Sequence, residues 1–295
     1  LVHFGGNTYC TREHDSLKIS NGKWCWFSRG IGGKTALDYL IKVKELPFTE
    51  AVERIVGRAA ERPSVFHARA QPEKPKTLLL PPKSNSNTRV IAYLKSRSID
   101  GGLIEQCIRS GQLYESLPHH NAVFVGMDRN GTLRYACLRG IGTDFKGEAT
   151  GSDKRFSFAL PATGESRMLC VFESAIDLLS YATMAQAGGL SWRSQHLLSL
   201  AGVYKPQKET QEHRLPLALT QYLKDHAEIK TICLCLDNDM TGRSATEAIR
   251  QQLAERYKVA SAFPRQGKDY NDWLCIRMGL QPAKENPMTE RSFAR

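Results

Sequence analysis

The second half of the chain alternates short apolar segments with helical segments, and this alternation limits the fold more than any other feature of the sequence. Four apolar segments have the length of single strands, namely RMLCVFE, HLLSLAG, IKTICLCLD and VASAFP. Segments with helical spacing separate them, such as SAIDLLSYATMAQA and TGRSATEAIRQQLAERY. Continuously apolar strands joined by helices predict a parallel sheet with helices on both faces. From residue 164 onward we therefore expect an α/β domain.

Acidic residues stand where these predicted strands end. Glu173 closes the first strand, Asp237 and Asp239 close the third, and Asp269 follows the last. The working site of an open parallel sheet lies at the carboxyl ends of its strands, so these carboxylates meet if the first and third strands are neighbours. Closely packed carboxylates need a neutralising cation or a retained proton, and Mg²⁺ prefers oxygen ligands of this kind. We therefore expect a Mg²⁺ (or Mn²⁺) site. The simpler alternative is that these acids are helix caps and turn residues, which accounts for one or two of them.

The order of these motifs resembles the Toprim domain, which bacterial DnaG-type primases, topoisomerases and some nucleases share. VFESAIDLLSY looks like the first motif of that family, with Glu173 in the place of its acid–base glutamate. LDNDMTGRSA looks like its metal-binding Asp-x-Asp motif, and GKDYNDWL looks like the Gly-Lys-Asp turn that precedes a helix. The resemblance implies that Glu173, Asp237 and Asp239 are catalytic, and that these three bind the metal ion together with Asp269.

Residues 1–60 resemble the zinc-finger domain of primases in the segments HDSLKI, WCWFSRGIGGKTALDYL and LPFTEAVERIVG. Where that family has Cys-x-x-Cys, residues 26–29 read Trp-Phe-Ser-Arg. Because a structural zinc site needs four ligands, we interpret the region as a degenerate finger without zinc, held by the packing of Trp24, Trp26 and Phe27. The alternative is a zinc site assembled from His3, Cys10, His14 and Cys25.

The same region contains Gly33-Lys34-Thr35 before a helical segment, which is the ending of a phosphate-binding P-loop. A P-loop has another glycine five positions before Gly33, and this chain has Ser28 there. An NTPase site is therefore a weaker alternative, although the turn could still bind phosphate through its amides and Lys34.

Residues 61–88 have the proline-rich composition of a linker, and residues 89–163 resemble the start of the primase catalytic core. The pattern of residues 89–163 predicts a small basic α+β subdomain, which contains a pair of helices and a hairpin around Asn130-Gly131. The resemblance implies a basic lining beside the Toprim acids. We expect nucleotide and nucleic-acid binding by Arg139, Lys154, Arg155 and Lys268. The alternative is an exposed hairpin with solvated lysines.

The Toprim domain is expected to span residues 164–279, followed by a tail of residues 280–295.

The composition is consistent with a polyanionic partner. The net charge is +11 and the isoelectric point is near 9.3. None of the eight cysteines forms a Cys-x-x-Cys pair, so we expect buried, reduced thiols and a cytoplasmic protein. There is no apolar segment of the roughly 18 residues that a membrane span needs, so no membrane partner is expected.

The resemblance implies a primase-like nucleotidyltransferase that joins nucleoside triphosphates on a single-stranded DNA template with Mg²⁺. One alternative is a Toprim nuclease or nicking enzyme that uses the same acids to cleave a strand. Another is an inactive DNA-binding protein of a mobile element. Nothing in the sequence resembles the helicase-interaction domain of primases, so the sequence gives no support for a helicase partner.

Overall fold

The computed structural model describes residues 1–60, 77–200 and 215–281, except the side chains of residues 58–60. The chain divides into two compact units, residues 1–73 and 74–295. Most of the predicted linker and tail, residues 61–76 and 282–295, lies outside the described residues.

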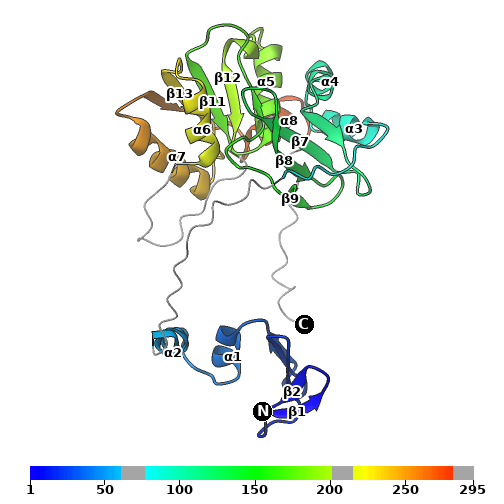
Figure 1. Cartoon of the computed structure of the whole chain (residues 1–295). Helices are drawn as coiled ribbons and strands as arrows, with labels where there is room; N and C mark the ends of the chain where they lie inside the picture. The colour runs from blue at the N-terminus through cyan, green and yellow to red at the C-terminus, as the bar shows by residue number, and fades with distance from the viewer. Residues whose placement is uncertain (61–76, 201–214, 282–295) are drawn as a thin grey trace. The chain divides into compact units, whose positions relative to one another are not determined.

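The N-terminal unit contains an antiparallel five-stranded sheet in chain order, β1 to β5, followed by two helices (Figure 1). The strands are β1 (Val2–Gly5), β2 (Thr8–Cys10), β3 (Leu17–Ser20), β4 (Lys23–Trp26) and β5 (Ile31–Gly33). The helices α1 (Ala36–Lys42) and α2 (Phe48–Ala60) lie on either side of Pro47, which cannot continue a helix.

A small core of Leu17, Trp24 and Trp26 holds this unit together. Trp24 and Trp26 are two residues apart on β4, so both side chains point to the same face of the sheet. The prediction that Phe27 joins this core is wrong, because its side chain is 68% exposed. Phe27 begins a short 3₁₀ turn (η1, Phe27–Arg29), where the chain leaves the strand and its alternation ends.

The segment Gly33-Lys34-Thr35 has a local structural explanation. Thr35 is the N-cap of α1 and accepts a hydrogen bond from the Asp38 amide at 3.0 Å. The Asp38 carboxylate accepts from the Lys34 amide and the Thr35 hydroxyl, so these donors are already used. At Gly33 a Cβ atom would lie 2.7 Å from the indole nitrogen of Trp24. Glycine is therefore required for the tryptophan to pack.

The second unit begins with two helices and an antiparallel sheet. The helices are α3 (Thr88–Ser96) and α4 (Gly101–Arg109), and the strands, in spatial order, are β6 (Leu113–Glu115), β7 (Ala122–Met127), β8 (Leu133–Arg139) and β9 (Lys146–Glu148). The predicted hairpin is the pair β7–β8. Asp128 organises its loop, because its carboxylate accepts the amides of Asn130 and Thr132. Gly131 takes the left-handed backbone conformation that the loop requires, at φ 77°.

The rest of this unit is a five-stranded sheet in the order β10-β12-β11-β13-β14. The strands are β10 (Ala159–Leu160), β11 (Met168–Phe172), β12 (His196–Ser199), β13 (Thr231–Leu234) and β14 (Lys258–Ser261). The last four are parallel, which confirms the predicted α/β class. The edge strand β10 is antiparallel, and its two residues are too few to give a recognisable pattern in the sequence.

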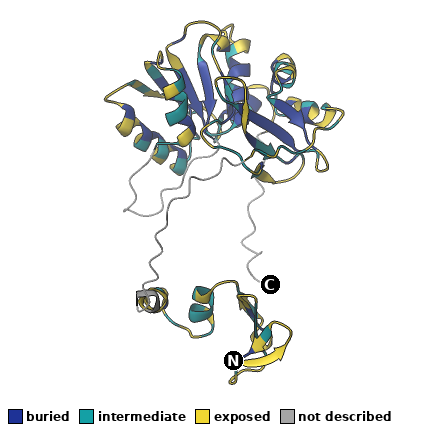
Figure 2. Cartoon of the chain, viewed as in Figure 1, coloured by how far each residue is buried: buried dark blue, intermediate teal, exposed yellow. Residues whose placement is uncertain are grey.

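Helices cover both faces of this sheet, as predicted (Figure 1). On one face, the core contains α5 (Ala175–Ala187) and α8 (Tyr270–Arg277), and it continues into α3 and α4. On the other face, the core contains α6 (Leu217–Asp225) and α7 (Met240–Leu253). Side chains of β11 alternate between the two cores, with Leu169 and Val171 in one and Cys170 and Phe172 in the other, so the strand is buried on both sides (Figure 2).

Within the described residues, none of the helices is long and apolar enough to cross a membrane.

Gly126 on β7 provides a test of the packing between this strand and the segment that joins β9 to β10. A Cβ atom at this position would lie 1.7 Å from the backbone oxygen of Phe156. We expect Gly126→Ala to lower the free energy of unfolding by more than about 2 kcal/mol, because the backbone must shift to admit the methyl group. Chemical denaturation measures this change. Gly188→Ala is the matched control, since its Cβ would lie 3.4 Å from Met184 O. Equal stability of the two variants would contradict the close approach.

Candidate active site

The pairing of β11 with β13 brings two of the predicted acids together. These strands are parallel and in register, with Val171 opposite Leu234. Glu173 and Asp237 follow the two strands at the same edge of the sheet. The Asp237 amide donates a hydrogen bond to Glu173 Oε1 at 3.2 Å. The two residues are thus in direct contact although 64 positions separate them in the chain.

Asp239 and Asp269 lie at the first turns of helices. Asp239 is the N-cap of α7 and accepts from the Gly242 amide at 2.8 Å. Asp269 is the N-cap of α8 and accepts from the Asp272 amide at 2.7 Å. The capping interpretation therefore applies to these two acids. It does not apply to Glu173, because the neighbouring Ser174 caps α5 instead.

Lys268 lies between the acids that follow β13. Its Nζ atom is 3.5 Å from Asp239 Oδ2 and 3.9 Å from Asp237 Oδ2. The Asn238 amide donates to the Lys268 carbonyl at 2.7 Å, which joins the loop after β13 to the loop before α8. The predicted residue Lys268 is therefore close to the acids, where its ammonium group balances part of their negative charge.

Burial and mutual repulsion raise the pKa values of most of these acids. Burial is the largest cause for Asp237, and nearby carboxylates add to it, raising its pKa to about 8. The pKa of Asp177, a buried acid on α5, is raised to about 7 for the same reasons. Burial also raises the pKa values of Glu173 and Asp269. By contrast, the Gly242 amide lowers the pKa of Asp239.

These acids have the properties of a site for a hard divalent cation. They supply carboxylate oxygens, the ligand type that Mg²⁺ and Mn²⁺ favour. A divalent ion would also offset the repulsion that raises their pKa values. The type of donor therefore fits the predicted metal ion, although no three of these described carboxylates place ligand oxygens within 4.8 Å of one another.

A cavity of about 850 Å³ connects this acidic edge to basic side chains of the antiparallel sheet. Glu173, Asp237 and Asp269 line one side of it, and Arg139 and Lys146 belong to the strands β8 and β9. Positive and negative groups thus line a single cavity, a combination that suits a metal-bound phosphate.

Lys154 and Arg155 are placed differently from Arg139. Lys154 Nζ is 3.0 Å from Glu148 Oε1, and Arg155 Nη2 is 2.6 Å from Asp153 Oδ2. Neither is among the described residues that line the cavity. Their predicted role in nucleic-acid binding stays a prediction, and both side chains are more than half exposed.

Arg97 and Asn271 also line the cavity, and the sequence did not predict either of them. Arg97 Nη1 donates to Asn271 Oδ1 at 2.6 Å, and the Asn271 amide group donates to Arg97 O and Ser180 Oγ. The Asn271 backbone amide also reaches Asp177 Oδ1 at 3.4 Å. This network joins the end of α3 to α5 and α8. The only hint in the sequence was the polar Asn271 one position before Asp272 in GKDYNDWL.

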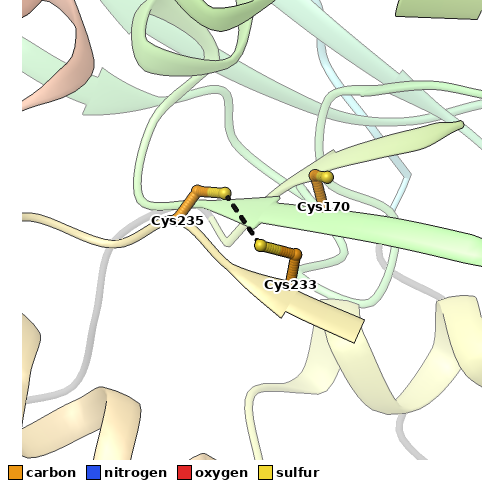
Figure 3. Close-up of side chains that lie close together, drawn as sticks. All are labelled: Cys170, Cys233 and Cys235. Atoms are coloured by element: carbon orange, nitrogen blue, oxygen red, sulfur yellow. Dashed lines mark hydrogen bonds between the residues drawn. The ribbon is translucent and has the colours of Figure 1, made fainter. Parts of the chain in front are cut away.

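Three cysteines lie in the core a few residues before the acids (Figure 3). Cys170 and Cys233 are register partners on β11 and β13, and Cys233 Sγ is 3.7 Å from Cys235 Sγ. Cys170 and Cys235 are buried, as expected for small apolar residues, while Cys233 is partly exposed. All eight cysteines have free thiols.

In the N-terminal unit, the ring of His14 packs against that of Trp26 at 4.5 Å between centroids. Among the described residues 1–60, no three histidine, cysteine or acidic side chains bring ligand atoms within 4.8 Å of one another. The alternative zinc site from His3, Cys10, His14 and Cys25 is therefore not assembled in this structure.

Comparison with protein families gives matches to two segments of the chain. Residues 170–274 match the family described as Toprim-like, and residues 92–164 match a family described as a protein of unknown function (DUF3991). The first match contains Glu173, Asp237, Asp239 and Asp269. The chain thus contains a Toprim-like domain, as the motifs predicted.

Two curated proteins are similar to most of the chain. An uncharacterized protein of Bacillus anthracis is 25% identical over 257 residues, which cover 82% of this chain and 70% of that protein. A 65 kDa protein of Zymomonas mobilis is 24% identical over 287 residues, which cover 90% of this chain. This chain spans only 46% of the Zymomonas protein.

Solved structures with some similarity include primases. The primase fragment of the bacteriophage T7 primase-helicase protein is 18% identical, with a TM-score of 0.45 and coverage of 90% of each chain. The E. coli primase catalytic core is 15% identical, with a TM-score of 0.41, and covers 64% of this chain and 69% of its own.

Replacing Asn271 tests the network that joins α3 to the Toprim-like domain. We expect Asn271→Ala to lower the free energy of unfolding by about 2 kcal/mol or more, because it removes the side-chain hydrogen bonds to the Arg97 guanidinium, the Arg97 carbonyl and the Ser180 hydroxyl. Thermal or chemical denaturation measures the change. Asn130→Ala in the exposed β7–β8 loop is the control, with an expected effect below about 0.5 kcal/mol. A similarly small effect at Asn271 would mean that the network contributes little to stability.

Proposed function

We propose that this protein is a primase-like nucleotidyltransferase that joins nucleoside triphosphates on a single-stranded DNA template with Mg²⁺ or Mn²⁺. One observation carries the proposal most directly. The cavity beside the contact between Glu173 and Asp237 has acids on the Toprim-like side and basic residues from β8 and β9. A triphosphate with its metal ion needs this pairing of charges. The match to the Toprim-like family and the net charge of +11 support the proposal.

In this proposal, Asp237, Asp239 and Asp269 hold the divalent ion, and Glu173 either joins them or accepts a proton. When bound, the ion shields phosphate charge and orients the attacking and leaving oxygens. The Asp237 amide fixes the position of Glu173 Oε1. Burial raises the pKa of Glu173, which makes it a better acceptor for the proton of an attacking 3′-hydroxyl.

The basic residues bind the phosphates and the template. Arg139 and Lys146 reach the cavity from the antiparallel sheet, and Arg97 reaches it from the end of α3. Asn271 holds the guanidinium of Arg97 at 2.6 Å, so this charge is positioned before any ligand arrives. Lys268, beside Asp237 and Asp239, is close to where the phosphates would meet the ion.

Variants that remove one acid each test the catalytic proposal. We expect Glu173→Gln and Asp237→Asn to reduce primer synthesis by at least about 100-fold, because each removes a proton acceptor or a metal ligand. Binding of single-stranded DNA should be largely retained, since the basic residues are unchanged. The assay incubates the protein with labelled nucleotides, DNA and Mg²⁺, and follows both new oligomers and shortened DNA.

Glu247→Gln at an exposed position of α7 and Asp225→Asn at a half-buried position of α6 are matched controls, and neither residue lines the cavity. They should leave synthesis unchanged. Primer synthesis retained by Glu173→Gln or Asp237→Asn would remove these residues from the reaction. If the wild-type protein shortens DNA and makes no oligomers, the alternative of a nuclease or nicking enzyme is correct.

Arg139 and Arg155 allow a comparison of two predicted contacts to nucleic acid. We expect Arg139→Gln to weaken binding of single-stranded DNA and to reduce the slope of log affinity against log salt by about 1, because one phosphate contact is lost. Arg155→Gln makes the same chemical change outside the cavity lining, where Asp153 already binds the guanidinium, and should have a smaller effect. Fluorescence anisotropy across a salt series measures both. A larger loss of affinity in Arg155→Gln than in Arg139→Gln would indicate that the DNA binds outside the cavity.

A further inference from the structure

A second polar cluster lies at the amino ends of the parallel strands, where the proposed reaction has no use for it. His196 is the first residue of β12, His226 is the C-cap of α6, and Glu228 lies in the loop before β13. Each of the three residues offers one ligand atom, and these three atoms all lie within 4.8 Å of one another. Two imidazoles and a carboxylate are a donor set typical of a transition-metal site.

His196 has a buried nitrogen atom that lacks a partner. The residue is only 4% exposed, and within the described part of the chain its Nε2 atom makes no hydrogen bond. A buried polar atom without a partner is costly, so a native structure usually satisfies it. The Nε2 atom faces Glu228, whose Oε1 atom is 3.8 Å away, beyond hydrogen-bond range. The same Oε1 atom is 3.0 Å from His226 Nδ1.

We propose that His196, His226 and Glu228 bind one Zn²⁺ ion, with water as the fourth ligand. Zinc bonds to nitrogen and oxygen at about 2.0–2.2 Å, which places neighbouring ligand atoms about 3.4 Å apart in a tetrahedron. The two nitrogen–oxygen distances, 3.0 and 3.8 Å, lie on either side of this value. These two distances need to change by only a few tenths of an ångström, and the imidazole nitrogens lie within 4.8 Å of each other.

The surroundings of the cluster hold these side chains in place. The second nitrogen of His196, Nδ1, is 3.0 Å from the hydroxyl of Tyr222 and 3.4 Å from the backbone amide nitrogen of Ala162, and these contacts hold the ring in position. The rings of Tyr222 and His226 are stacked, with centroids 4.3 Å apart. The Ile229 amide bonds to the His226 carbonyl, and the Ile229 side chain is buried, so the turn that carries Glu228 is fixed.

The protonation states also suit metal binding. Burial lowers the pKa of His196, which keeps its ring neutral near pH 7. A hydrogen bond from its own backbone amide is the largest cause that lowers the pKa of Glu228, and the hydrogen bond with His226 lowers it further. The carboxylate therefore stays ionised. Neutral imidazole and ionised carboxylate are the forms that coordinate zinc.

The position of this cluster gives the ion a structural role. His196 lies opposite Leu169 at the start of β11, whereas the candidate active site follows Phe172 at the other end of that strand. About three residues, or roughly 10 Å of strand, separate the two ends. A zinc ion here would join the start of β12 to the turn between α6 and β13, which are 30 residues apart in the chain, and would stabilise the folded unit.

The experiment must separate this site from the other metal-binding groups of the protein. The chelator-treated protein is titrated with Co²⁺, a spectroscopic substitute for Zn²⁺, in excess Mg²⁺ so that the carboxylate site is filled. Thiolate ligation by Cys170, Cys233 and Cys235 would give a sulfur-to-cobalt charge-transfer band, whereas nitrogen and oxygen ligands give none.

We expect one equivalent of Co²⁺ to bind without a sulfur-to-cobalt charge-transfer band. Zn²⁺ should displace the bound Co²⁺ and raise the melting temperature of the protein by several degrees. His226→Gln and Glu228→Gln should each weaken binding by more than about 100-fold, and Tyr222→Phe by about tenfold. Cys233→Ser should bind as the wild type does. His226 and Glu228 are not fully buried, so both variants should fold, and circular dichroism checks this.

Three results would overturn the proposal. Co²⁺ binding unchanged in both His226→Gln and Glu228→Gln would exclude these ligands. A charge-transfer band that Cys233→Ser abolishes would assign the metal to the cysteines. The absence of binding at stoichiometric Co²⁺ would leave the cluster as an ordinary pair of histidines beside a carboxylate.

Discussion

The parallel pairing of β11 with β13 is the constraint on which the candidate active site depends. Because the two strands are neighbours and in register, their carboxyl ends place Glu173 against the backbone of Asp237. The sheet order puts β12 and β13 on either side of β11, so no other strand intervenes between these acids. Had β12 been inserted between β11 and β13, the same residues would lie about 10 Å apart, beyond the reach of a single ion. The chemistry that we propose therefore follows from strand order as much as from residue type.

The arrangement also balances charge in a way that neither subdomain achieves alone. The Toprim-like domain brings together acids whose pKa values are raised by burial and repulsion. The antiparallel sheet contributes Arg139 and Lys146 to the same cavity. A metal-bound triphosphate, with both negative oxygens and a positive ion, is complementary to both sides. The function that we propose therefore draws on residues from both parts of the unit.

Much of the fold and part of the site follow from patterns in the sequence. The strands and helices of the Toprim-like domain were predictable because fully buried strands are continuously apolar, as in MLCVF on β11. Glu173 was recognisable because it directly follows β11, and the other three acids because they lie between a strand and the next helix. Arg97 and Asn271 were not, since 174 residues separate these hydrogen-bonded partners and neither belongs to a periodic pattern. Phe27 was misassigned because the alternation of β4 ends one residue earlier. The cluster of His196, His226 and Glu228 depends on a turn geometry that spacing alone does not reveal.

The helix caps formed by Asp239 and Asp269 have a consequence for comparing related chains. Both acids stabilise the start of a helix, so a chain that had lost all enzymatic activity would still be under selection to keep them. Within the described part of the chain, Glu173 and Asp237 cap no helix, and burial raises the pKa values of both. Across a family, the disappearance of these two residues, with the caps retained, would therefore distinguish members that only bind from members that react.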